Sequence, residues 1–247
     1  MAPGSSTVAY IALRAPIIPA TNRTHALLVP VVNFTTVAIG TGPPGSAQFG
    51  APIELDLFDR GFRSIEWSGS EYLIVAGTPY DNTGAYPRDF RLFTWSGNPA
   101  DQPRQRSADL TDMNPEAIVE LPGAPLQPTD QIQIISDNGR RLWYGDDIQA
   151  KFLPERNFRK FRSDRVTLGP VVKSAPYIVS NIVSQTGITV KWRSRQGDTY
   201  RVQYKTSLTS PNWIDVSGDV TATGPISVKF HALAPGTRRF YRVIALP

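Results

Sequence analysis

The sequence predicts an all-β protein of two domains, and three observations support this prediction. The 247 residues include 19 glycines and 22 prolines, which suits many short strands joined by turns. The apolar fraction is 40% and the charged fraction 19%, as in folded globular proteins. No segment keeps a helical period over several turns, whereas many short segments are rich in β-branched and aromatic residues. We place the domains at residues 1–170 and 171–247.

Residues 1–170 contain consecutive short segments of high β propensity separated by turn residues. Ser68-Gly69 predicts a tight hairpin, and Asn138-Gly139 is a strong signal for a type I′ hairpin turn. The predicted strands are Val8–Leu13, Ala26–Val32, Glu54–Leu57, Ser64–Trp67, Tyr72–Ala76, Arg91–Trp95, Ala117–Leu121, Gln131–Ser136 and Val166–Leu168.

Residues 151–165 form a basic stretch in which Phe152, Phe158 and Phe161 are interleaved. Aromatic side chains among arginines can stack on bases or sugars. The run is short and lies where the first domain should end. We therefore favour a connecting segment whose aromatic rings pack on the preceding sheet, and we expect no specific nucleic-acid partner.

Residues 171–247 show the regular strand spacing of a β-sandwich. With no cysteine in the chain, Trp192 and Tyr241 are expected to fill the core between two sheets. The predicted strands are Tyr177–Val183, Ile188–Arg193, Tyr200–Lys205, Trp213–Val216, Ile226–Phe230 and Phe240–Leu246.

Several kinds of chemistry are excluded or weakened by composition. The absence of cysteine excludes disulfides, thiolate zinc sites and a cysteine nucleophile. The two histidines, His25 and His231, lie far apart in the chain and are expected to be structural. Residues 1–18 lack the pattern of a signal peptide, and no stretch is long and apolar enough to span a membrane.

The excess of positive over negative charge comes entirely from the last part of the chain. Residues 1–172 contain 16 basic and 18 acidic side chains, whereas residues 173–247 contain 10 basic and 3 acidic side chains. A positive surface on the C-terminal domain can attract acidic glycans, nucleic acid or other anions, but we favour the alternative of a basic face that is merely solvated.

The C-terminal segment resembles the fibronectin type III-like repeats found at the ends of secreted proteins of Verrucomicrobia and related bacteria. The resemblance implies an immunoglobulin-like sandwich and an extracellular or cell-surface location, and it implies no catalysis. It is carried by Trp192, residues 197–204, Leu208, Asn212-Trp213 and Arg239-Phe240-Tyr241-Arg242-Val243.

Residues 8–168 resemble the later part of an uncharacterised bacterial family of β-propeller domains. At about 40 residues per blade, this length implies about four blades. The domain is then either a small or open propeller or one that lacks its N-terminal half. The resemblance is carried by residues 9–16, 26–30, 60–65, 72–77, 92–97, 114–117 and 136–139, in that order.

This resemblance implies a candidate site on the loops of one propeller face. Arg60, Arg63, Glu116, Asp137 and Asn138 are the polar residues expected to converge there as ligand-binding residues. Glu116, Asp137 and Asn138 loosely resemble the way lactonase and phytase propellers present oxygens to calcium. The alternatives are that residues 137–139 are simply a hairpin turn and that Arg63 pairs with Glu116 across blades.

The sequence contains no strong catalytic constellation, such as a nucleophile elbow or a phosphate loop. We therefore expect an extracellular binding or interaction protein that needs no cofactor. The alternative is a hydrolase of lactones, phosphoesters or carboxyl esters that is assisted by calcium. The oligomeric state is left open.

Overall fold

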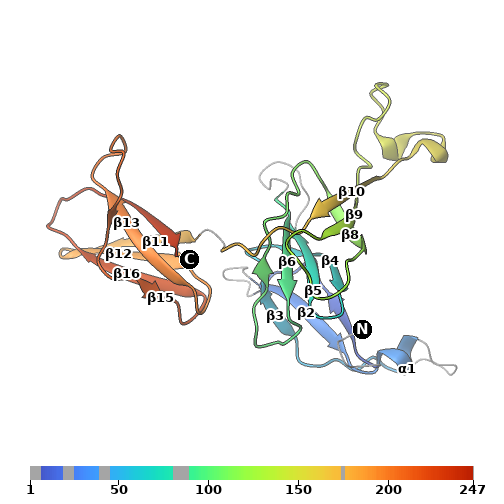
Figure 1. Ribbon diagram of the computed structural model, residues 1–247, viewed down its shortest axis with the longest axis horizontal. Helices are drawn as coiled ribbons and strands as arrows, with labels where there is room; N and C mark the ends of the chain where they lie inside the picture. Colours follow the sequence, from blue (N-terminus) through green and yellow to red (C-terminus); the bar gives the residue numbers. More distant parts are fainter. Residues whose placement is uncertain (1–6, 19–24, 39–44, 80–88, 174–175, 247) are drawn as a thin grey trace. The chain divides into compact units, whose positions relative to one another are not determined.

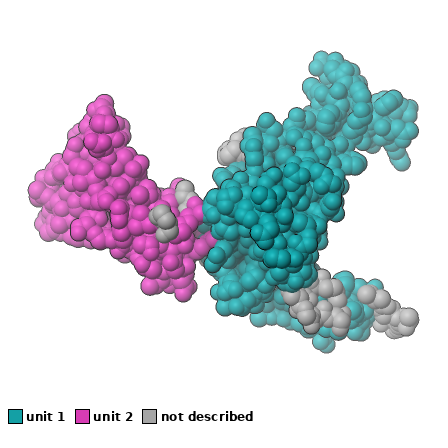
Figure 2. Space-filling view, viewed as in Figure 1, with its two compact units in different colours: residues 1–172 teal, residues 173–247 magenta. Residues whose placement is uncertain are grey.

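The computed structural model describes residues 7–18, 25–38, 45–79, 89–173 and 176–246, and it divides into two compact units (Figures 1 and 2). Unit 1 comprises residues 1–172 and unit 2 comprises residues 173–247. The sequence predicts this boundary after residue 170. Strands make up 44% of the structure and helices 5%, which confirms the predicted all-β class.

The described residues of unit 1 form three antiparallel sheets whose strands follow one another in chain order: β1-β2-β3, β4-β5-β6-β7 and β8-β9-β10. A five-residue helix, α1 (Phe34–Ala38), follows β2. The strands are β1 (Ala9–Ala12), β2 (His25–Val31), β3 (Ile53–Asp56), β4 (Gly61–Trp67), β5 (Tyr72–Gly77), β6 (Arg91–Trp95), β7 (Arg104–Gln105), β8 (Pro115–Glu120), β9 (Gln131–Ser136) and β10 (Arg162–Thr167).

Strand β4 lies between the first and the third sheet and contacts both. Its Phe62 amide donates to the carbonyl of Leu13 at 3.3 Å, just after β1. Further along β4, the Ser64 hydroxyl accepts from the Ile118 amide of β8 at 3.1 Å. A Cβ atom on Gly61 would collide with the backbone of Arg14, so a glycine is needed where β4 begins.

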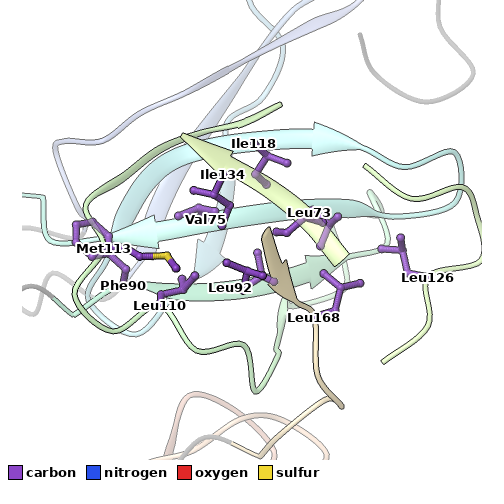
Figure 3. Packing of buried hydrophobic residues seen from close by; sticks show 12 residues of the cluster. Leu73, Val75, Phe90, Leu92, Leu110, Met113, Ile118, Leu126, Ile134 and Leu168 are labelled. Atoms are coloured by element: carbon purple, nitrogen blue, oxygen red, sulfur yellow. The ribbon is translucent and has the colours of Figure 1, made fainter. Parts of the chain in front are cut away.

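The sheet β4-β5-β6-β7 has a buried cluster on each face. On one face, Leu73, Val75 and Leu92 pack against residues of the third sheet such as Ile118 and Ile134 (Figure 3). On the other face, the cluster joins β5 and β6 to the first sheet. It contains Tyr72, Ile74, Ala76, Phe93 and Trp95 together with Ala26, Leu28, Ile53, Leu55, Leu57 and Phe62. Apolar residues on both faces of β5 are therefore buried, which explains its uninterrupted apolar run.

The predicted hairpin at Asn138-Gly139 is wrong. Ser136 pairs with Arg162 at the end of the β9–β10 ladder, so residues 137–161 form a long excursion between two neighbouring strands. This excursion, which we call the arm, contains two short 3₁₀ helices, η1 (Ala150–Phe152) and η2 (Arg156–Phe158). Figure 1 shows it in yellow, projecting beyond β8, β9 and β10.

The arm also changes two further expectations. The resemblance implies about four blades, whereas the described residues of unit 1 form three sheets, and the arm contributes no strand to them. Phe152, Phe158 and Phe161 were expected to pack on the preceding sheet. These residues are instead 67%, 53% and 67% exposed. The favoured interpretation of this segment was therefore wrong.

Unit 2 contains two antiparallel sheets, β11-β12-β16 and a second sheet centred on β13. In the second sheet β13 pairs with β17 along one edge and with the short β14 and β15 along the other. The strands are β11 (Tyr177–Val183), β12 (Gly187–Arg193), β13 (Thr199–Lys205), β14 (Ile214–Asp215), β15 (Val220–Thr221), β16 (Ile226–Ala232) and β17 (Phe240–Ala245).

One buried cluster joins the two sheets of unit 2. Trp192 is fully buried and lies edge-on to Tyr200, with ring centroids 6.1 Å apart. Tyr241, the other expected core residue, is partly buried and packs against the same cluster. The cluster consists of Val190, Trp192, Tyr200, Val202, Val216, Ala222 and Val243.

Candidate functional site

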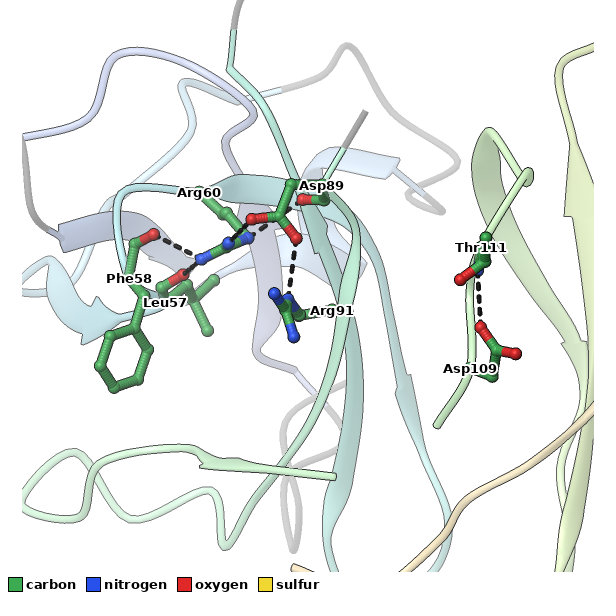
Figure 4. Close-up of polar contacts among 7 residues, drawn as sticks. All are labelled: Leu57, Phe58, Arg60, Asp89, Arg91, Asp109 and Thr111. Carbon is green, nitrogen blue, oxygen red and sulfur yellow. Dashed lines mark hydrogen bonds and ion pairs between the residues drawn. The ribbon is translucent and has the colours of Figure 1, made fainter. Parts of the chain in front are cut away.

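Arg60 lies in unit 1 just before β4, after a turn in which Phe58 and Asp59 both have left-handed backbone conformations. Its guanidinium donates to the carbonyl oxygens of Phe58 at 2.6 Å and Asp89 at 3.0 Å. It also forms an ion pair with the Asp89 carboxylate, which in turn accepts from Arg91 at 2.8 Å (Figure 4). These contacts stabilise the turn, so Arg60 has a structural role that the sequence analysis did not foresee.

Arg63 and Glu116 each lie at a β-bulge, in two strands that contact each other. Each is the extra residue of a β-bulge, Arg63 in β4 and Glu116 in β8. A bulge turns a side chain away from the regular alternation of its strand. Here both side chains turn toward each other, and Arg63 Nη1 lies 2.6 Å from Glu116 Oε1.

The Arg63 side chain is only 2% exposed, whereas that of Glu116 is 39% exposed. Arg63 Nη2 donates to the Thr78 carbonyl at 3.2 Å, and the guanidinium lies over the Phe90 ring, 5.4 Å from its centroid. Glu116 therefore presents a carboxylate partly to solvent while a buried arginine holds it from below. Pairing between these two residues was one of the alternatives left open by the sequence.

Several charges act on the Glu116 carboxyl group. Burial raises its pKa most strongly, and the Asp137 carboxylate acts in the same direction. Arg63 and Arg14 lower the pKa but do not outweigh burial, so the net direction is upward. Arg14, which follows β1, was missed in the sequence analysis because nothing local to residue 14 shows that β1 adjoins β4.

Asp137 and Asn138 lie at the base of the arm. Asp137 is exposed, and its Oδ1 accepts from the Gly139 amide at 2.9 Å, as in a simple Asx turn. Asn138 is 3% exposed, and its side-chain nitrogen has no partner among the described residues. Asp137 thus lies close enough to influence Glu116, whereas Asn138 is enclosed within the base of the arm.

The described residues contain no group of three or more histidine, aspartate or glutamate side chains placed to hold a metal ion. Calcium favours six to eight oxygen ligands. Because Arg63 already holds one oxygen of Glu116, a calcium ion would have to compete with this guanidinium. Calcium binding by Glu116, Asp137 and Asn138 therefore stays a prediction.

Unit 2 has too few acidic residues to neutralise its basic residues. Arg201 takes up two of the three acidic side chains, since it bonds to Asp219 at 2.7 Å and to Asp215 at 3.1 Å. Asp219 raises the pKa of Arg201, so this cation keeps its proton at every relevant pH. The positive excess of unit 2 must therefore come from its other arginines and lysines.

Two of these cations gather around Trp213. The Lys205 ammonium lies 4.8 Å and the Arg242 guanidinium 4.4 Å from the indole ring. Arg242 also donates to the side chain of Gln203 at 2.7 Å, across the β13–β17 pair. The sequence analysis did not single out this cluster, although strand alternation places residues 203 and 205 on one face of β13.

The two histidines have separate environments. His25 begins β2 in unit 1. His231 lies in β16 of unit 2, where its Nδ1 is 2.9 Å from the Tyr241 hydroxyl. Burial lowers the pKa of His231, and the nearby Arg239 contributes in the same direction. A neutral imidazole bonded to a phenol fits the structural role that was expected.

No described helix is both long enough and apolar enough to cross a membrane. The chain matched no protein-family model, no curated protein and no solved structure. The geometry described above is therefore the basis for any functional conclusion.

Proposed function

We propose that this chain is an extracellular binding protein that recognises an anionic polymer, such as an acidic glycan, through unit 2. In this proposal unit 1 is a small, open β-propeller-like domain. Its three sheets each run in chain order, and β4 joins the neighbouring sheets, as successive blades would. Unit 2 is a fibronectin type III-like sandwich, supported by two sheets that share one core around Trp192.

The observation that carries the proposal is the distribution of charge. Unit 2 holds 10 basic and 3 acidic residues in 75 positions, and two of those acidic residues are bound to Arg201. Unit 1 has 16 basic and 18 acidic residues. Net charge therefore favours attraction of an anionic polymer to unit 2 over attraction to unit 1.

The cations around Trp213 are the best-defined part of this basic surface. The indole ring holds the charged ends of Lys205 and Arg242 in position, together with the Ser210 carbonyl for Lys205 and the Gln203 side chain for Arg242. Cations that are already ordered lose less side-chain entropy when they bind sulfate or carboxylate groups. Replacing these two residues should therefore weaken binding more than an equal loss of charge elsewhere.

Heparin chromatography of the full-length chain tests this proposal. The double variant Lys205→Ser/Arg242→Ser should elute at clearly lower salt than the unmodified protein. The matched control is Arg91→Ser/Arg165→Ser, which removes two exposed arginines from unit 1. If the elution salt fell equally in the two variants, the interaction would depend on net charge alone. If the unmodified protein were not retained on heparin, the proposal would be overturned.

A hydrolase is the second candidate, and it rests on Glu116. This carboxyl group has a raised pKa, lies beside Arg63 and is partly open to solvent, which are properties shared by many catalytic acids. A screen against lactones, phosphoesters and carboxyl esters, with and without calcium, tests this alternative. Turnover that disappears in Glu116→Ala would replace the binding proposal, and no turnover on any substrate would leave the hydrolase without support.

A further inference from the structure

The arm of unit 1, residues 137–161, is an internally bonded element. The Lys151 amide donates to the Gly139 carbonyl at 2.8 Å, and the Ala150 amide donates to the Arg141 carbonyl at 2.9 Å. Ala150 and Leu153 are 1% and 5% exposed, so the arm has a small apolar base. It therefore presents its remaining side chains from a defined scaffold.

A second set of contacts orders the outer part of the arm. The Tyr144 hydroxyl donates to the Phe158 carbonyl at 3.2 Å, and the two rings meet edge to face with centroids 5.8 Å apart. The Lys160 ammonium lies 5.0 Å from the Tyr144 ring. These contacts join the two halves of the arm through an aromatic pair and a cation.

Most of the large apolar side chains of the arm are nevertheless exposed. Single exposed apolar residues are normal on a protein surface, but a concentration of them marks an interaction site. In Figure 2 the arm forms a lobe that stands out from the rest of unit 1. The exposed set is Leu142, Tyr144, Ile148, Phe152, Phe158 and Phe161.

Cations accompany the three exposed phenylalanines. Residues 149–161 contain four basic side chains, Lys151, Arg156, Arg159 and Lys160, and one acidic side chain, Glu155. The Lys151 ammonium lies 4.7 Å from the Phe152 ring. The remaining residues of the arm, 137–148, contain two arginines and three aspartates. Exposed phenylalanines and an excess of basic side chains therefore occur together in the second half of the arm.

We propose that the second half of the arm, residues 149–161, inserts its phenylalanines into the interface of a lipid bilayer that contains anionic headgroups. Exposed apolar side chains bury themselves at the boundary between headgroups and acyl chains, and neighbouring lysines and arginines bind the anionic surface. The arm carries both features on one projecting element. This inference does not depend on the proposal for unit 2.

The chemistry of the arm favours a bilayer over single-stranded nucleic acid. Base stacking needs open aromatic faces. Here Lys151 lies over Phe152 and Phe158 is engaged with Tyr144, which leaves Phe161 as the phenylalanine of the arm without a ring contact among the described residues, and Leu142 and Ile148 have no ring at all. Aliphatic and phenyl side chains without hydrogen-bonding groups are suited to an apolar medium.

Vesicle flotation with the full-length chain is the first test. We expect binding to vesicles of phosphatidylcholine mixed with phosphatidylglycerol and much weaker binding to phosphatidylcholine alone. The triple variant Phe152→Ser/Phe158→Ser/Phe161→Ser keeps every charge of the protein, including those of unit 2. Its affinity for mixed vesicles should fall by at least about tenfold, because the apolar area that enters the interface is lost.

Phe49→Ser is the matched control, since Phe49 is 61% exposed and lies in unit 1 outside the arm. This variant should bind mixed vesicles like the unmodified protein. Equal affinity of the triple variant and the unmodified protein would overturn the proposal. So would tighter binding to a single-stranded oligonucleotide that depends on the same three phenylalanines.

A labelling experiment tests insertion without removing the whole cluster. The chain has no cysteine, so Phe152→Cys and Phe49→Cys each create one site for an environment-sensitive fluorophore. Mixed vesicles should shift the emission of the label at position 152 to the blue and leave the label at position 49 unchanged. A label at position 152 that stays in an aqueous environment on bound protein would overturn the proposal.

Discussion

The two units bury their sheets in different ways. In unit 1 the sheet β4-β5-β6-β7 is covered on both faces, and all six residues of β5 are buried. In unit 2 the sheets β11-β12-β16 and β13–β17 share one cluster between them. Each sheet of unit 2 therefore has an inner face that contributes to this cluster and an outer face that does not.

The outer face of β11-β12-β16 shows that apolar side chains on a strand do not by themselves make a core. Strand pairing aligns Tyr177, Arg193 and Ile226 in one row and Ile182, Thr189 and Phe230 in another. Apolar residues thus flank a polar central strand, and Tyr177 and Phe230 remain 68% and 50% exposed. Whether an apolar residue stabilises a unit depends on which face it occupies.

The largest expected effect that tests this comparison comes from Trp192→Ala. Removing a fully buried tryptophan costs about 3–5 kcal/mol, which is a large fraction of the stability of a small domain. We expect calorimetry to show a lower unfolding temperature for unit 2 and an unchanged transition for unit 1.

Val228→Thr is the control for this substitution, because Val228 lies on the outer face of the same sheet and is 54% exposed. Its effect should stay within about 0.5 kcal/mol. The comparison would fail if Trp192→Ala lowered the unfolding temperatures of both units. It would also fail if Val228→Thr lowered the unfolding temperature of unit 2 as much as Trp192→Ala does.

An intermediate effect is expected for Glu116→Ala in unit 1. The substitution removes the carboxylate partner of Arg63, whose side chain is 2% exposed, and an unsatisfied buried donor costs about 1–3 kcal/mol. Chemical denaturation followed by intrinsic fluorescence measures this loss. Glu120→Ala on the same strand breaks an exposed pair with Arg165 and should cost about 1 kcal/mol or less. If both substitutions lowered the free energy of unfolding equally, the ion pair that joins the two bulges would add nothing to the stability of unit 1.

The smallest effect concerns pH and should be confined to unit 2. Because the pKa of His231 lies below its ordinary value of 6.5, the unfolded chain takes up this proton at a higher pH than the folded chain does. The free energy of unfolding of unit 2 should therefore decrease as the pH falls through 6.5.

Melting temperatures at about pH 7.5 and about pH 5.5, on either side of this value, test the prediction. His231→Gln should reduce the pH dependence of the unit 2 transition, whereas His25→Gln in unit 1 should leave that transition as it is. If the melting temperature of unit 2 depended on pH in the same way in His231→Gln, titratable groups other than His231 would be responsible for the pH dependence.

Local patterns in the sequence determined the strands of this protein. Segments rich in β-branched and aromatic residues, bounded by turn residues, predicted β5, β6, β9, β12, β13 and β17 nearly at their observed bounds, because strand formation reflects residues that are close in the chain. The short elements β7, β15 and α1 were not predicted, since two to five residues are too few to show a period.

Only the tertiary structure decided what the candidate residues do. Arg63 and Glu116 are 53 positions apart, and they meet because two bulges face each other across neighbouring sheets. The same holds for Asn138-Gly139, whose local signal predicts a hairpin although the β9–β10 ladder closes at Ser136 and Arg162, which are 26 positions apart. Sequence periodicity reports which face of a strand a residue occupies, but the partner on that face is set by contacts between distant segments.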